Sequence, residues 1–83
     1  MRRIMVEAME AMADMRAIGE QTSFSTAEIA KALGIEPWRV RRSLKALVKD
    51  EFALVWADGS DRWCIDPRFV RLQQFLKESK LAP

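Results

Sequence analysis

The sequence predicts a single, mainly α-helical domain with one small β-hairpin. In four segments apolar residues recur every three or four positions, which is the period of an amphipathic helix. A lone Asp58–Gly59 pair lies between two β-prone runs and is typical of a hairpin turn. The chain has 83 residues, of which 49% are hydrophobic and 31% charged, so we expect one globular domain over residues 1–83.

The first helix is predicted at about residues 3–17, and Gly19 follows it as a stop signal. Its apolar face consists of Met5, Ala8, Met9, Met12 and Met15. A face of this kind packs into the core of a domain or forms the contact of a dimer. We favour core packing, with a homodimer through helix 3–17 as the alternative.

The second and third helices are predicted at about residues 26–33 and 37–49, because both carry start signals. Ser25 and Glu28 have the spacing of a capping box, in which each side chain binds the other residue's backbone N–H. Gly34 suits the end of the second helix. Pro37 suits the first position of the third, where its missing N–H costs nothing.

The third helix divides into an apolar face and a basic face. The apolar stripe consists of Val40, Leu44, Leu47 and Val48. The opposite face of the helical period carries Trp38, Arg42, Lys45, Ala46 and Lys49, with Arg39 and Arg41 on its flanks. A basic helix face is most often simply solvated, so this pattern alone does not identify a ligand.

The hairpin is predicted at about residues 53–66, with Trp56 and Trp63 as candidates for a cross-strand contact. A last helix is predicted at about residues 67–80, where Phe69, Leu72 and Leu76 form an apolar stripe. This helix is the second candidate for a homodimer contact, beside helix 3–17.

The composition argues against an enzyme, a metal protein or a membrane protein. The chain has no histidine for acid–base catalysis, and its single cysteine, Cys64, lacks the partners of a zinc site. Three dispersed glycines do not make a phosphate-binding loop. No apolar run approaches the roughly 20 residues that span a bilayer. We therefore expect no catalytic residues, no cofactor, no metal and a cytoplasmic location.

The run STAEIAKALGIEPWRVRRSLKALVKDEF, residues 25–52, resembles the winged helix-turn-helix family. The turn A-x-x-L-G-I between two short helices, followed by V-x-x-x-L-x-x-L, carries the resemblance. It implies a three-helix core, a wing formed by the hairpin and an extra C-terminal helix. It also implies a transcriptional regulator whose helix 37–49 enters the major groove of double-stranded DNA.

The resemblance turns Trp38, Arg39, Arg42 and Ser43 toward the groove and places Lys45 and Lys49 near phosphates. Side-chain chemistry agrees, because arginine binds guanine bidentately and hydroxyl groups bind phosphate. The hairpin contributes one cation among three aspartates, so its acidity opposes DNA binding. The expected DNA-binding residues are Ser25, Thr26, Trp38, Arg39, Arg41, Arg42, Ser43, Lys45, Lys49 and Arg62.

A second resemblance implies an alternative function. The run V-x-x-x-L-x-A-L-V-x-D-E-x-x-x-x-W-x-x-G-S, residues 40–60, is similar to the D proteins of dissimilatory sulfite reduction. That family implies a small, non-catalytic accessory protein, discussed both as a DNA binder and as a partner of the reductase. The chain would then dock a protein partner through Trp38 and the hairpin, whose acidity suits a protein better than DNA.

Overall fold

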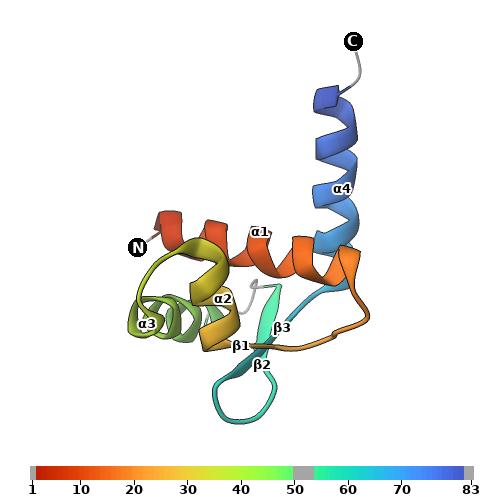
Figure 1. Ribbon diagram of the computed structural model, residues 1–83. Helices are drawn as coiled ribbons and strands as arrows, with labels where there is room; N and C mark the ends of the chain where they lie inside the picture. Colours follow the sequence, from red (N-terminus) through yellow and green to blue (C-terminus); the bar gives the residue numbers. More distant parts are fainter. Residues whose placement is uncertain (1, 50–53, 82–83) are drawn as a thin grey trace.

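The computed structural model describes residues 2–49 and 54–81, which form a mainly helical fold with a small antiparallel sheet (Figure 1). The elements in chain order are α1 (Arg2–Ile18), β1 (Phe24–Ser25), α2 (Thr26–Leu33), α3 (Pro37–Val48), β2 (Val55–Ala57), β3 (Arg62–Ile65) and α4 (Pro67–Leu81). Each predicted helix is present, and each begins and ends at or next to the predicted residue. The predicted hairpin is present as β2 and β3, while residue 53, its expected start, lies outside the described residues.

The sequence signals at α2 and α3 are confirmed. The Glu28 backbone N–H donates to the Ser25 hydroxyl at 3.1 Å, and the Ser25 N–H donates to the Glu28 carboxylate at 3.3 Å, which completes the capping box. Gly34 ends α2 with a φ of 69°, a left-handed conformation that glycine adopts without strain. Pro37 is the first residue of α3, so only a short turn separates the two helices.

The sheet has a third strand that the sequence does not predict. β3 lies in the centre, with β1 on one side and β2 on the other. Strand β1 contains only Phe24 and Ser25, which is too short a run to show the alternation of a strand. Phe24 pairs with Trp63 and Ser25 with Arg62, so the segment before α2 is tied to the hairpin.

The two hairpin tryptophans lie on opposite faces of the sheet. Trp56 is paired with Cys64, whereas Trp63 is paired with Ala57. Directly opposite residues share a face, and successive residues along a strand alternate between faces. The predicted contact between Trp56 and Trp63 is therefore wrong. Trp63 is buried in the core, and Trp56 is 46% exposed.

The core lies between α1, α2, α3 and the inner face of the sheet. Its buried residues are Ala8, Met12, Phe24, Ile29, Ala30, Val40, Leu44, Val55, Trp63 and Ile65. Met12 is fully buried, and Met9 and Met15 pack partly against the core. The predicted core packing of the α1 face is therefore confirmed.

Helix α4 crosses α1 and then projects from the body of the molecule (Figure 1). Phe69 and Val70, in its first turn, pack against the core. Farther along, Gln73 donates to the Glu10 carboxylate at 3.2 Å, and Lys77 forms an ion pair with Asp14. None of the helices in the described part of the chain is both long and apolar enough to cross a membrane.

Candidate nucleic-acid interface

The outer face of α3 carries a line of exposed side chains. Trp38, Arg42, Lys45 and Lys49 are all exposed, and their spacing of four, three and four residues aligns them along one side of the helix. We call these four residues the α3 stripe. Trp38 is 57% exposed, so it is a surface residue rather than a core residue.

The core determines which way the α3 stripe faces. On the opposite side of the helix Val40 and Leu44 are fully buried, and Leu47 and Val48 pack partly against the core. Because this apolar side must be covered, the basic side is turned to solvent. The predicted division of α3 into an apolar face and a basic face is confirmed.

The cations of the α3 stripe are not neutralised by neighbours. Arg42, Lys45 and Lys49 make no salt bridge within the described residues. On the flanks of the stripe, Arg39 lies 3.6 Å from the Glu36 carboxylate, and Arg41 forms a salt bridge with Asp61 of the hairpin. Aligned, unpaired cations create a positive potential that attracts anions such as phosphate groups.

Two open hollows border the α3 stripe. One, of about 430 Å³, lies along α3 and is lined by the stripe together with Arg41 and Ala46. The other, of about 740 Å³, lies between α3 and the hairpin tip, where Gly59 and Ser60 form part of its wall. Arg41, Lys45 and Lys49 line both hollows, which therefore share a basic wall.

Asp61, at the tip of the hairpin, fastens the hairpin to α3 and α2. Arg41 donates two hydrogen bonds to its carboxylate, from Nε to Oδ1 at 2.9 Å and from Nη2 to Oδ2 at 3.2 Å. The Thr26 hydroxyl donates to the same carboxylate at 2.5 Å. These hydrogen bonds, Arg41's foremost, lower the pKa of Asp61 to about 2, and the same contact raises the pKa of Arg41.

The contacts of Asp61 continue into the core. The indole N–H of Trp63 donates to the Thr26 hydroxyl at 2.9 Å in a buried position. The Thr26 backbone N–H donates to the Asp61 carbonyl at 3.2 Å. Asp61 has a φ of 60°, a left-handed conformation that aspartate tolerates better than most residues. We call Arg41, Asp61, Thr26 and Trp63 the hairpin latch, because they position the hairpin against α3.

Two of the expected DNA-binding residues are buried, and their prediction is wrong. Thr26 and Ser43 have no exposed surface. The Thr26 hydroxyl serves the hairpin latch, and Ser43 lies on the inner side of α3 beside Leu44. The helical period contains a signal for Ser43, since it lies three residues after the buried Val40. No local pattern marks Thr26, because its partners are more than thirty residues away.

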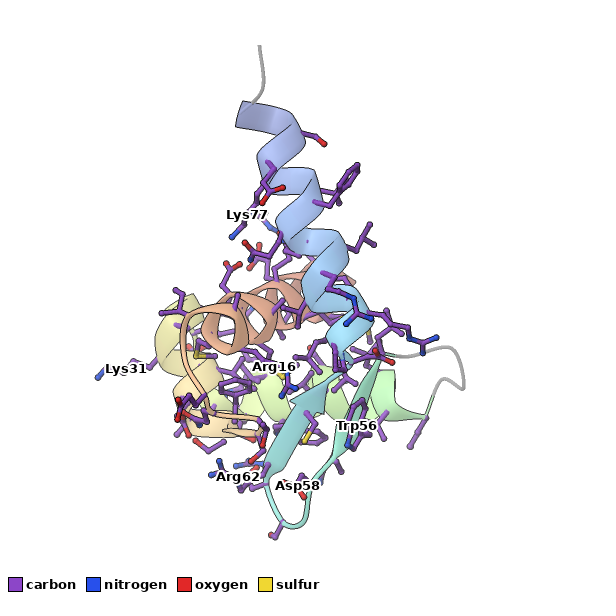
Figure 2. The ribbon with its side chains drawn as sticks, turned by 90° about the vertical axis from the view of Figure 1, so that its right-hand side faces the viewer. Arg16, Lys31, Trp56, Asp58, Arg62 and Lys77 are labelled. Carbon is purple, nitrogen blue, oxygen red and sulfur yellow. The ribbon has the colours of Figure 1, made fainter. Side chains whose placement is uncertain are left out.

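Ser25 and Arg62 do not join the α3 stripe. They are paired with each other across β1 and β3, and neither lines the two hollows. Arg62 donates to the Ser23 hydroxyl at 3.1 Å and to the Ser23 carbonyl at 2.9 Å, so it holds the segment before α2. Figure 2 shows Arg62 and Asp58 at the hairpin, with Trp56 on the outer face of the sheet.

The hairpin is less acidic than its sequence indicates. Arg41 neutralises Asp61, and Arg68 lies 2.8 Å from the Asp66 carboxylate, where its hydrogen bonds lower the pKa of Asp66. Asp58 makes no salt bridge within the described residues. The repulsion expected between the hairpin and DNA is thereby reduced mainly to one carboxylate.

The described residues offer little else that binds a ligand. Across residues 2–49 and 54–81 no three Cys, Asp or Glu side chains gather closely enough to hold a metal ion. Burial raises the pKa of the Cys64 thiol, which disfavours the reactive thiolate.

Comparison with protein-family models, curated proteins and solved structures finds no match for this chain. A function must therefore be inferred from the geometry of α3 and the hairpin.

Proposed function

We propose that this protein binds double-stranded DNA through the α3 stripe, as a small cytoplasmic transcriptional regulator of the winged helix-turn-helix kind. The observation that carries the proposal is the line of Arg42, Lys45 and Lys49, which are exposed and form no salt bridge in the described residues. The order of elements supports it, because α2, a short turn, α3 and a hairpin follow one another as in that family.

The α3 stripe has the dimensions of a major-groove contact. From Trp38 to Lys49 the helix advances by about 16 Å, at about 1.5 Å per residue. A major groove about 12 Å wide admits one α-helix. The small side chain of Ala46 allows close approach, and Arg42 can then donate to the edge of a guanine. Lys45 and Lys49 suit the phosphates at the border of the groove.

The hollow between α3 and the hairpin offers a second contact. Lys45 and Lys49 line its helical side, and Gly59 and Ser60 line its hairpin side. One sugar–phosphate strand would lie in this hollow, bound by the two lysines and by the Ser60 hydroxyl. Asp61 opposes this contact only weakly, because Arg41 neutralises its carboxylate.

Fluorescence anisotropy of a labelled random duplex, titrated across a salt series, tests the proposal. We expect log affinity to fall linearly with log salt, because each neutralised phosphate releases counterions. Lys45→Ala should weaken binding and reduce the steepness of this line by about 0.9. Lys77→Ala is the matched control, since it removes one positive charge from α4, away from the hairpin (Figure 2), and should leave the line unchanged.

Two results would contradict the proposal. A protein that binds no duplex at low salt would exclude DNA as the partner of the α3 stripe. If Lys45→Ala and Lys77→Ala lowered the affinity for the duplex equally, binding would depend on the overall charge of the protein rather than on α3.

Exposure of Trp38 favours a second candidate function, docking of a protein partner. A tryptophan that is 57% exposed is well suited to anchor a protein interface, where tryptophan is enriched among the residues that carry most of the binding energy. On this proposal the chain is an accessory protein similar to the D proteins of dissimilatory sulfite reduction. The same titration separates the two functions, because protein docking predicts no duplex binding at low salt.

A further inference from the structure

Helix α4 carries an apolar ridge that is about half exposed in the described part of the chain. Leu72, Phe75 and Leu76 are 50%, 63% and 46% exposed, and we call them the α4 ridge. These side chains reach solvent on the helix that projects from the body of the molecule (Figure 1). Large apolar side chains gathered on one exposed face mark an interaction surface.

The α4 ridge is large enough for a small protein contact. A large aromatic side chain covers about 150–250 Å², so Phe75, at 63% exposure, alone exposes roughly 100–150 Å². The exposed Val6 of α1 lines a hollow together with Leu76 and extends the ridge. A contact of this limited size falls in the class of weak interfaces, which bury less than about 1,200 Å² in total.

The two edges of the α4 ridge differ. On one edge α4 is bound to α1, through Gln73 with Glu10 and through Lys77 with Asp14. The other edge carries Arg71 and Glu78, which are seven residues apart and therefore lie on the same side of the helix. Neither forms a salt bridge within the part of the chain that the structure describes.

These opposite charges distinguish the possible arrangements of two α4 helices. In an antiparallel pair, Arg71 of each copy lies opposite Glu78 of the other, so two ion pairs flank the apolar contact. In a parallel two-fold pair, the Arg71–Glu78 edges of the two copies lie on opposite sides of the contact, so these ion pairs cannot form. Charges at the edges of helix pairs set their orientation in this way.

We infer that two copies of this protein form a two-fold dimer in which the α4 ridges pack antiparallel. A second copy suits the surface because one self-complementary patch supplies both the apolar contact and the two ion pairs. The inference is independent of DNA binding. Figure 1 shows α4 and α3 on opposite sides of α1, so the dimer leaves both α3 stripes exposed.

Sedimentation equilibrium over a series of protein concentrations tests the dimer. We expect the wild-type protein to dimerise with a dissociation constant in the micromolar range, as the modest area indicates. Phe75→Glu should be monomeric throughout, because it would place unpaired charges in the centre of the contact. Circular dichroism checks that this variant keeps its helices, which is expected because Phe75 is 63% exposed.

A charge exchange tests the antiparallel orientation. Arg71→Glu alone and Glu78→Arg alone should each weaken the dimer by about 3- to 10-fold, since each replaces two attractive pairs by two repulsive ones. The double variant has the net charge of the wild-type protein and should recover the wild-type dissociation constant.

Each outcome bears on a different part of the inference. A wild-type protein that stays monomeric at the highest concentration overturns the dimer, and a dimer that survives Phe75→Glu overturns the α4 ridge as its contact. A double variant that remains weakened overturns the antiparallel orientation. Random-duplex binding by monomeric Phe75→Glu is measured separately, so failure of the dimer and failure of the proposed function are distinguishable.

Discussion

At the scale of single residues, Asp61 connects the hairpin to α3 and to the start of α2. In the sequence it is one of three aspartates that oppose DNA binding. In the structure it binds Arg41 and Thr26, and Thr26 in turn accepts the indole N–H of Trp63. One carboxylate therefore links α3, the start of α2 and the core. The hairpin position depends on this latch because the hairpin tip extends beyond the core.

The latch predicts how the stability depends on pH. The folded pKa of Asp61, about 2, lies below its ordinary value of 3.8, so the folded state binds the proton more weakly than the unfolded state does. This stabilisation is fully present above the ordinary pKa and is lost as the pH falls toward about 2. We expect Asp61→Asn to lower the melting temperature at neutral pH, with a difference from wild type that shrinks below about pH 4.

Asp58→Asn is the matched control for the Asp61 variant. It removes the same charge from the same hairpin, but Asp58 makes no salt bridge in the described residues. Thermal unfolding followed by circular dichroism should show little change in this variant. Equal melting temperatures for the two variants at neutral pH would contradict the latch.

At the scale of elements, α2 and the turn after it determine where α3 begins. The capping box at Ser25 and Glu28 starts α2, and Gly34 ends it with a left-handed residue. Pro37 starts α3 soon afterwards. If α2 began at a different residue, α3 and its stripe would therefore change position. Ser25 thus has a structural role in positioning the site, although it does not line the hollows beside α3.

We expect Ser25→Ala to lower the free energy of unfolding by about 1 kcal/mol, because it removes the side chain that caps the Glu28 N–H. Ser25→Asp should retain most of the stability, since aspartate is an equally good cap. Urea denaturation followed by circular dichroism measures the difference. Thr22→Ala, at an exposed residue without a hydrogen bond in the described part of the chain, is the control. A Ser25→Ala variant as stable as this control would contradict the cap.

At the scale of the whole molecule, the chain consists of a packed body and a projecting helix. The body surrounds one core built from α1, α2, α3 and the sheet. Helix α4 adds Phe69 and Val70 to that core and then leaves it, so its outer half is supported mainly by α1. The candidate DNA surface and the candidate dimer surface are thereby placed on opposite sides of α1 (Figure 1).

This division into a packed body and a projecting helix predicts that the backbone amides of α3 and α4 differ in their protection from hydrogen exchange. In dilute protein, amides of α4 beyond Phe75 should exchange with solvent faster than amides of α3 near Leu44, because few buried contacts oppose local opening there. Hydrogen exchange followed by NMR measures both regions in one sample. Protection of α4 should rise with protein concentration if the ridges pair. Equal protection of the two helices in dilute protein would contradict the division.

Local patterns in the sequence are sufficient to determine the helices, the capping box, the hairpin turn and the basic face of α3. Each depends on residues within a few positions of one another, as Ser25 and Glu28 show. The helical period also implies that Ser43 points inward, although the resemblance to DNA-binding helices turned it toward the groove. The position of the α3 stripe was thus predictable, because the apolar side of a helix must be buried.

Only the tertiary structure decided how distant residues combine. Strand β1 is stabilised by pairing with β3. Asp61 binds Thr26, which is 35 positions away in the sequence, and Arg41, which is 20 positions away. No local period encodes such contacts, because they depend on how the elements pack. Likewise, the apolar pattern of α4 predicts an apolar stripe but does not show which surface the stripe packs against. Phe69 packs partly against the core and Phe75 is exposed, since the helix extends past the core that its first turn contacts.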